Sequence, residues 1–318
     1  MKELIIGLDT SNYRTSIAAV TPGGEIILNV RRLLPVASGE RGLRQSDALF
    51  MHLKQAKEMM TALQEACKGF IIAAAAASVK PRGLPESYMP VFLAGEIIAR
   101  SIAAPLSIPF YSSDHQSGHI RAACWGTELE HTEKYLALHL SGGTTDLLLW
   151  HDNTAEGLGS SLDLHAGQLV DRVGVAMGLL FPAGPELEKL ALQGESTGRL
   201  GCSMTEHDLC CHFSGAETKA LQWIREDRYP KEVIAREVFD LLSRTAARML
   251  QAGGKKTCVT DALICGGVAS SPLFRQMLKK RCERMTVRPV FGDETLSGDN
   301  AVGVALIGAD RYRREYGR

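Results

Sequence analysis

The sequence predicts an α/β protein built from two similar units, each with strands and helices in nearly the same order. Three observations lead to this fold class. Apolar, strand-like runs alternate with amphipathic helical segments, three strands open the chain as a meander, and a comparable order returns in the second half. At 318 residues the chain has the length of about two domains, each large enough to bury a full core.

The first half opens with three short strands and continues with alternating helices and strands. A Pro22-Gly23-Gly24 turn between the second and third strands indicates an antiparallel meander. Asp114 is placed to cap a helix that follows a short strand. A meander followed by helix, strand, helix and strand is the order of a ribonuclease-H-like unit. The expected strands are residues 4–11, 15–20, 25–32, 70–78 and 105–110, and the expected helices are residues 45–68 and 88–104.

The second half repeats this order and adds helices in its middle. We therefore expect one unit over residues 1–130 and a second over residues 131–298, with a cleft between them. The second unit carries a helical insertion at about residues 155–225, and the C-terminal helix, about residues 299–318, packs back on the first unit. The expected strands are residues 134–140, 147–151, 259–265 and 286–291, and the expected helices are residues 162–179, 185–193 and 231–251, with others beginning at residues 271 and 300.

The composition is that of an ordinary globular protein, with 45% apolar and 23% charged residues. Lysine plus arginine and aspartate plus glutamate both number 36, so net charge predicts no attraction to a membrane or a nucleic acid, although a local basic patch could still serve an RNA partner. The eight cysteines are scattered and no signal peptide is present, which indicates reduced thiols in a cytoplasmic protein. The longest apolar run, residues 70–79, is too short to span a bilayer, so we expect no membrane segment.

His115 and His119 are candidates for metal ligands. They follow the cap Asp114 and lie four residues apart, on one face of the expected helix. Two imidazoles at this spacing can share one metal ion, as in zinc helices with an HExxH motif, but the glutamate of that motif is absent, which argues against a metalloprotease. Asp299 stands at the start of the closing helix, where it fits either an N-cap or a metal ligand.

Two turns rich in glycine and hydroxyl groups, residues 7–11 and 140–145, are candidates for phosphate loops. Glycines let a phosphate approach the backbone, and free N–H groups and hydroxyls can hold it. Either turn alone also fits an ordinary hairpin, but one turn opening each half suggests two phosphate loops facing a common cleft. The strand, diglycine turn and helix start at residues 263–273 are suited to a nucleoside, although packing alone can also explain them. Asp171, a lone acid on an expected helix, by itself fits a solvated face better than a binding site.

Together these stretches resemble the TsaD/Gcp family, formerly called peptidase M22. The resemblance runs nearly from end to end, and the family belongs to the actin/hexokinase/Hsp70-like ATPase superfold. The matching motifs, in chain order, are His115-Gln-Ser-Gly-His119, Ser141-Gly142-Gly143, Ala166-Gly167-Gln168-Leu169-Val170-Asp171, Pro182-Ala183-Gly184-Pro185, Phe213-Ser214-Gly215, Gly266-Gly267-Val268 and Asp299-Asn300.

The resemblance implies an acyltransferase, which moves a threonylcarbamoyl group from threonylcarbamoyl-AMP to N6 of the adenosine next to the tRNA anticodon. It implies one iron or zinc ion held by His115, His119 and Asp299. It also implies tRNA as a partner, together with proteins like TsaB and TsaE. The residues implied to contact the nucleotide, threonylcarbamoyl-AMP or ATP/AMP, are His139, Leu140, Ser141, Gly142, Gly143, Asp171, Gly184, Gly266, Gly267 and Ser271.

The chain departs from the family pattern after its first strand. Thr10-Ser11-Asn12-Tyr13-Arg14-Thr15 replaces Thr-Ser-Cys-Asp-Glu-Thr, so the acidic pair is gone. Neither Asn12 nor Tyr13 can act as a carboxylate base, and no catalytic residue is assigned. The alternative is a divergent paralogue that binds nucleotide and metal as a complex partner, without catalysis or with weak ATPase activity. A sugar kinase of the same superfold would need an acid such as Asp9 or Asp146 and would leave the histidine pair unexplained.

Overall fold

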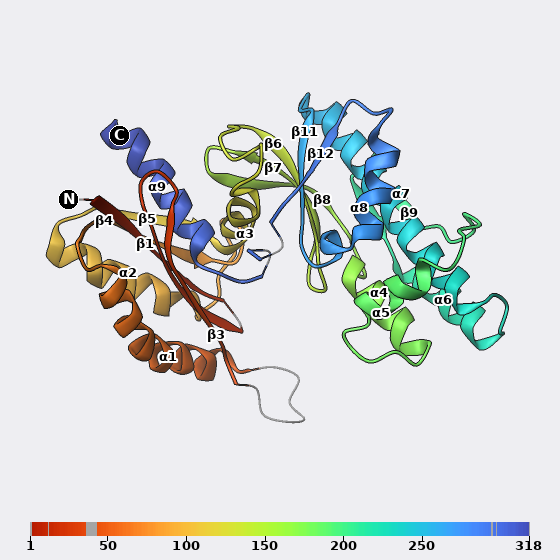
Figure 1. Cartoon of the computed structure of the whole chain (residues 1–318), viewed down its shortest axis with the longest axis horizontal. Helices are drawn as coiled ribbons and strands as arrows, with labels where there is room; N and C mark the ends of the chain where they lie inside the picture. The colour runs from red at the N-terminus through yellow and green to blue at the C-terminus, as the bar shows by residue number, and fades with distance from the viewer. Residues whose placement is uncertain (1, 12, 36–42, 294, 297, 318) are drawn as a thin grey trace. The chain divides into compact units, whose positions relative to one another are not determined.

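The computed structural model describes residues 2–11, 13–35, 43–293, 295–296 and 298–317, and Figure 1 shows the course of the chain. The chain forms two compact units. Unit 1 comprises Met1–Trp125, Asp152–Ala155 and Thr295–Arg318, and unit 2 comprises Gly126–His151 and Glu156–Glu294. Among the described residues, each unit contains one five-stranded sheet with helices beside it, so the predicted α/β class is confirmed.

The sheet of unit 1 has the strand order β3-β2-β1-β4-β5. Its first three strands form the antiparallel meander that the sequence predicts, and β4 and β5 add to β1 in parallel. The strands are β1 (Lys2–Thr10), β2 (Arg14–Val20), β3 (Ile26–Leu33), β4 (Phe70–Lys80) and β5 (Phe110–Asp114), and the helices of the unit are α1 (Gln45–Ala66), α2 (Phe92–Leu106), α3 (His115–Cys124) and α9 (Val302–Tyr316).

Helices cover both faces of this sheet because alternate side chains of β1 point to opposite sides. Leu4 and Ile6 lie in one apolar cluster with Met59 of α1. Ile5 lies in another cluster with Leu306 of α9. Figure 1 accordingly shows α1 and α2 on one side of the sheet and α9 on the other. The C-terminal helix thus packs on the first unit, although it follows the last strand of the second.

The sheet of unit 2 has the order β12-β11-β6-β7-β8, which repeats the order of unit 1 strand for strand. Its middle strands, β6 and β7, form the predicted hairpin, and β11 and β12 run parallel to β6. The strands are β6 (Tyr135–Leu140), β7 (Thr145–His151), β8 (Thr154–Ser160), β11 (Asp261–Cys265) and β12 (Arg288–Phe291), and the helices are α4 (Ala166–Ala176), α5 (Gly184–Ala191), α6 (Ser214–Arg225), α7 (Lys231–Thr257) and α8 (Pro272–Cys282), with a short hairpin of β9 (Ser203–Thr205) and β10 (Cys210–His212).

Several expected elements differ from the structure. The expected strand at residues 105–110 is wrong, because Pro105 belongs to the last turn of α2 and the strand begins at Phe110. Proline keeps a helical φ but lacks the N–H for one helical hydrogen bond, and the helix ends one residue after it. Ser107 then ends the helix in the left-handed region, with φ at 52°. The strand β8 was not expected, since its two glycines, Gly157 and Gly159, weaken the strand signal.

No helix in the described part of the chain combines the length and the apolar character needed to cross a membrane.

Candidate metal centre and nucleotide pocket

The helix α3 carries the histidine pair, and the end of β5 fixes where this helix begins. Asp114 has extended backbone angles and accepts hydrogen bonds from the Ser117 amide at 2.9 Å and the Ser117 hydroxyl at 2.6 Å. The N-cap predicted from the sequence is therefore confirmed. Because the first turn is fixed, His115 and His119 lie one above the other on the same helical face.

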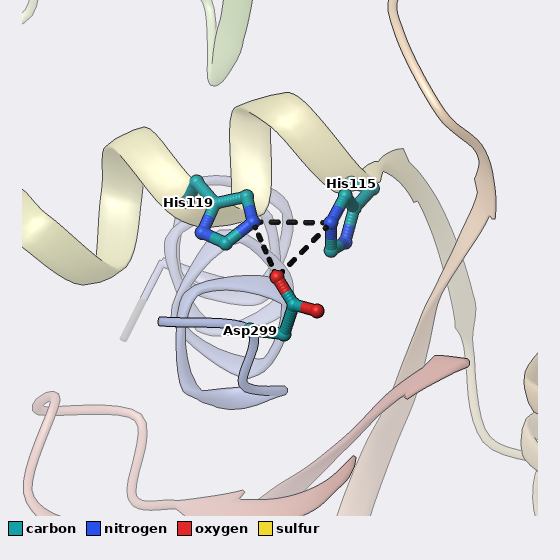
Figure 2. Close-up of side chains that lie close together, drawn as sticks. All are labelled: His115, His119 and Asp299. Carbon is teal, nitrogen blue, oxygen red and sulfur yellow. Dashed lines mark hydrogen bonds and ion pairs between the residues drawn. The ribbon is translucent and has the colours of Figure 1, made fainter. Parts of the chain in front are cut away.

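Asp299 lies against this histidine pair, just before the start of α9. Its Oδ1 is 3.1 Å from Nε2 of His119 and 3.6 Å from Nε2 of His115, and the two Nε2 atoms are 3.0 Å apart (Figure 2). Ala301 is the residue at the N-cap of α9, and Asn300 accepts the amide of Val302, so Asp299 does not serve as the cap. Of the two roles that the sequence left open for Asp299, the geometry favours metal ligation.

A close approach of two helices brings Asp299 to the histidines. Gly118 lies on α3 between them, and Gly303 lies in the first turn of α9. A Cβ atom on Gly303 would be 1.8 Å from the carbonyl oxygen of Gly118, and one on Gly118 would be 2.9 Å from the Val304 side chain. Only glycine at both positions allows this contact. The glycine within the His-x-x-x-His motif thus has a structural reason, because it determines how near α9 comes.

Residues at and just beyond the end of β1 hold His115 and Asp299 in place. Asp9, at the end of β1, is fully buried, and its Oδ1 accepts from Nδ1 of His115 at 2.8 Å and from the Ser78 hydroxyl. The Ser11 hydroxyl donates to Oδ2 of Asp299 at 3.0 Å. The sequence offered Asp9 as a member of the candidate phosphate loop at residues 7–11 and as the acid of a sugar-kinase alternative, but not as a partner of His115. Its contact with His115 depends on strand pairing, which the local sequence does not reveal.

The charges of the cluster suit a divalent cation. Burial alone would lower the pKa of His115, but the carboxylates of Asp9 and Asp299 outweigh it and raise the pKa to about 10. Burial would likewise raise the pKa of Asp299, but hydrogen bonds and charge from His115 and His119 hold it well below its usual range. A divalent ion bound to two neutral imidazoles would balance both carboxylates, because protons and metal compete for the same nitrogens.

The donor set also suits a transition metal. His115, His119 and Asp299 can each offer one ligand atom, and these atoms lie within 4.8 Å of one another. Zinc keeps about 2.0–2.2 Å from imidazole nitrogen and carboxylate oxygen, which these separations permit. Oδ2 of Asp9 is buried and accepts no hydrogen bond from the residues that the structure describes. It can therefore still accept one when the site holds a metal ion. The residues therefore fit the iron or zinc that the family resemblance implies.

A pocket of about 360 Å³ lies within unit 2, a volume in the range of small-molecule sites. The predicted residues Gly142, Asp171, Gly184, Gly267 and Ser271 line it. Val170, from the same motif as Asp171, also lines it, and so do Glu188 and Phe239, which the sequence did not single out.

The Ser-Gly-Gly loop contributes Gly142 to this pocket and packs directly on the start of α4. A Cβ atom on Gly167 would be 2.6 Å from the backbone nitrogen of Gly142, so only glycine fits there. The Gly167 amide donates to the Ser141 carbonyl at 3.0 Å. His139 and Leu140 are buried in β6 and do not line the pocket, nor do Ser141, Gly143 and Gly266.

Acidic and hydroxyl side chains form the opposite part of the pocket. Oδ1 of Asp171 accepts the amide of Ala183 at 2.8 Å, so the acid fixes the turn that contains Gly184. Oε1 of Glu188 accepts the Leu273 amide at 2.7 Å. The Ser271 hydroxyl caps α8 by accepting the Phe274 amide at 3.1 Å. Serine is one of the residues preferred at this capping position.

Comparisons with known structures bear on the fold. HypF from T. kodakarensis aligns with a TM-score of 0.62 at 12% identity, covering 99% of this chain and 48% of that one. A ROK family glucokinase from Streptomyces griseus aligns with a TM-score of 0.52 at 12% identity, covering 98% of this chain and 99% of that one. At such identities the likeness concerns the fold alone. It supports the predicted actin/hexokinase-like architecture.

Sequence comparisons bear on the family. A family model described as "TsaD: tRNA N6-adenosine threonylcarbamoyltransferase" matches residues 87–306. A protein of that name from Corynebacterium aurimucosum is 30% identical, with 96% of this chain and 91% of the relative aligned. Another from Oenococcus oeni is 28% identical, with 98% and 91% aligned. A probable bifunctional tRNA threonylcarbamoyladenosine biosynthesis protein from Thermoplasma volcanium is 26% identical, over 98% of this chain and 56% of its own. This chain belongs to the TsaD family of tRNA N6-adenosine threonylcarbamoyltransferases.

Proposed function

We propose that this protein transfers a threonylcarbamoyl group from threonylcarbamoyl-AMP to N6 of the adenosine next to the tRNA anticodon. The N6 amine attacks the carbamoyl carbon, the bond from that carbon to the phosphate oxygen breaks, and AMP leaves while N6 loses a proton. The observation that carries the proposal is the convergence of His115, His119 and Asp299 in a member of this family. Their spacing and charge give a reason for a metal at this point of the fold.

In this proposal the three side chains hold one iron or zinc ion. When bound, the ion supplies a Lewis acid able to polarise an oxygen of the mixed anhydride. The chain itself orients the ligands: Asp9 holds His115 from behind, and the Ser11 hydroxyl holds Asp299. The exposed fractions of the His115, His119 and Asp299 side chains are 20%, 13% and 30%, so one side of the cluster remains open to a substrate.

The nucleotide occupies the pocket of unit 2 in this proposal. Gly142 and Gly267 let its phosphate and ribose come close to the backbone. Asp171 and Glu188 are the acceptors available to ribose hydroxyls. Val170 and Phe239 supply an apolar surface for the base. Two further predicted contacts, Gly184 at the start of α5 and Ser271 at the cap of α8, also line this pocket. The remaining predicted contacts lie in β6 or in the glycine turns that follow β6 and β11, and they are His139, Leu140, Ser141, Gly143 and Gly266.

The proton on N6 does not require a carboxylate base from the N-terminal stretch. Asn12 lies outside the described residues, and Tyr13, with 49% of its surface exposed, offers only a phenol. An aromatic amine can attack an activated acyl group before it loses its proton, and the departing phosphate can accept that proton. The transfer therefore relies on the reactive anhydride and on positioning. Transfer RNA is the acceptor in this proposal, and TsaB-like and TsaE-like proteins are the partners to test in the cytoplasm.

The test supplies purified protein with zinc or ferrous iron, threonylcarbamoyl-AMP and unmodified tRNA, alone and with TsaB-like and TsaE-like proteins. Mass spectrometry of digested tRNA should detect N6-threonylcarbamoyladenosine. The His119→Ala variant, which keeps the pocket of unit 2, should produce none. Intact AMP binding without any transfer in all mixtures would reject the transferase and favour a non-catalytic complex partner.

A further inference from the structure

We propose that Asp9 is a positioning residue that acts through His115 and sets the affinity of the metal centre. Its carboxylate holds the imidazole in the orientation and tautomer that direct Nε2 toward the ion. The inference deepens the proposed function and rests on its metal site. It also gives a role to Asp9, an acid near the end of β1. The family's acidic pair is missing from the residues that follow this strand.

Two central strands fix the carboxylate of Asp9. Residue pairing along β1 and β4 joins Leu8 to Ala77, which places Asp9 beside Ser78, and the Ser78 hydroxyl donates to Oδ1. The carboxylate is fully buried, so its position does not depend on a mobile surface side chain. The same Oδ1 accepts from Nδ1 of His115 at 2.8 Å. One rigid oxygen therefore aligns the ring.

The hydrogen bond determines which nitrogen of His115 remains available. A neutral imidazole carries one N–H, and here Nδ1 donates it to Asp9, which leaves the lone pair on Nε2. Nε2 is the atom that lies 3.0 Å from Nε2 of His119 and 3.6 Å from Oδ1 of Asp299. A carboxylate behind a metal-binding histidine raises its basicity and keeps its orientation.

A purely structural role for Asp9 makes a different prediction. A buried carboxylate beside a buried imidazole can simply complete an ion pair, and its removal would then destabilise unit 1 without acting on the metal through His115. Asp9 does not belong to the group of atoms close enough to share one ion, which in the described part of the chain comprises His115, His119 and Asp299. Its influence on the metal must therefore pass through His115, and a double-mutant cycle can detect this.

The first experiment measures zinc affinity by competition with a chelator for Asp9→Asn, His115→Ala and the double variant. Asp9→Asn should weaken binding by about 10- to 100-fold, the usual effect of losing such a partner. In the His115→Ala background it should cause no further loss. Ser78→Ala, which keeps the carboxylate, serves as the matched control and should cause a much smaller loss. Wild-type zinc affinity in Asp9→Asn, or losses that add in the double variant, would overturn the proposal.

The second measurement needs no variant at residue 9 and so does not depend on its folding. Nitrogen-15 NMR of the zinc-loaded, full-length protein should show His115 with a proton on Nδ1 and the metal on Nε2. Metal on Nδ1 would overturn the proposal. If His115→Ala and His119→Ala both keep full zinc affinity, the metal site itself is wrong. If they lose zinc and Asp9→Asn does not, only the role of Asp9 is wrong.

Discussion

Replacement of Glu237 by glutamine should destabilise unit 2 by about 2–4 kcal/mol at neutral pH. Glu237 is fully buried on α7 and holds the segment 196–200 against that helix. Its Oε1 accepts from the Ser196 hydroxyl at 3.2 Å, from the Thr197 hydroxyl at 2.7 Å and from the Thr197 amide. Its Oε2 accepts from the Leu200 amide at 3.0 Å.

The magnitude follows from what glutamine can and cannot replace. Its carbonyl oxygen can take the place of Oε1, but its NH₂ group faces the Leu200 amide and cannot accept from it. A buried donor left without a partner costs about 1–3 kcal/mol. The three remaining bonds weaken as well, because hydrogen bonds to a charged acceptor contribute about 1.5–3 kcal/mol each and neutral ones about 0.5–1.5 kcal/mol. The unpaired Leu200 amide and the weakened hydrogen bonds both contribute to the loss of stability. Because the segment 196–200 can rearrange and recover part of it, we expect the total loss to lie near the lower end of the summed values.

The effect should also depend on pH. Burial alone would raise the pKa of Glu237, but hydrogen bonds from Leu200, Thr197 and Ser196 outweigh it and lower the pKa. A carboxyl group whose pKa is lowered by folding stabilises the protein above its unfolded pKa, about 4.3, and loses that contribution as the pH falls through the folded value. The difference between wild type and variant should therefore be full at neutral pH and shrink in acid.

Urea unfolding at several pH values, combined with hydrogen exchange of the Leu200 amide, measures both effects. The Glu237→Gln variant should unfold at lower urea and exchange this amide faster. Glu195→Gln is the matched control, because Glu195 directly precedes this segment, is exposed, and the substitution removes the same charge. Equal destabilisation by the two variants, or a difference that stays constant into acid, would refute the reasoning.

Three further predictions concern the two sites. His119→Ala should reduce bound iron or zinc from about one ion per chain to near none on elemental analysis, and unchanged content would exclude a ligand role. Gly167→Ala should strain the Ser-Gly-Gly loop by about 1–3 kcal/mol and weaken AMP binding in calorimetry, whereas Gly215→Ala, with open space around it, should not. Gly303→Ala should push α9 from α3, which should lower both the thermal midpoint and the metal content; a variant that keeps full zinc would contradict this role of the helix contact.

The sequence predicted the features that depend on local patterns. The meander, the duplicated strand order and the Asp114 cap follow from turn residues, apolar runs and a single capping side chain, and the structure contains all three. The histidine pair also follows from local spacing. Asp299 lies far from it in the chain. The local sequence left a cap and a metal ligand open for this residue, and only the family resemblance linked it to the histidine pair.

Other features depend on contacts that no local pattern encodes. Asp9 reaches His115 because β4 pairs with both β1 and β5, and His115 follows β5 directly. Glu188 reaches the pocket of unit 2 because α5 packs near the start of α8. The strand β8 was missed because glycine weakens its pattern. Residues 105–110 were misassigned because Pro105, a residue type that disfavours the helix interior, still belongs to the last turn of α2. In each case the structure depends on tertiary contacts or on where an element ends, and a local sequence pattern reveals neither.

The loss of the family's acidic pair changes what the residues after β1 contribute to the metal centre. Arg14 lies in this stretch, and its Nη1 donates to the backbone carbonyl of Asp299 at 3.3 Å. From β3, Nη2 of Arg31 donates to the carbonyl of Thr295 at 3.2 Å. Guanidinium groups have no lone pair for a metal, so these side chains hold the loop before α9 without competing as ligands. Because the cluster keeps its ligands and gains no base, the proposed transfer must depend on the reactivity of the anhydride and on the alignment of the acceptor amine.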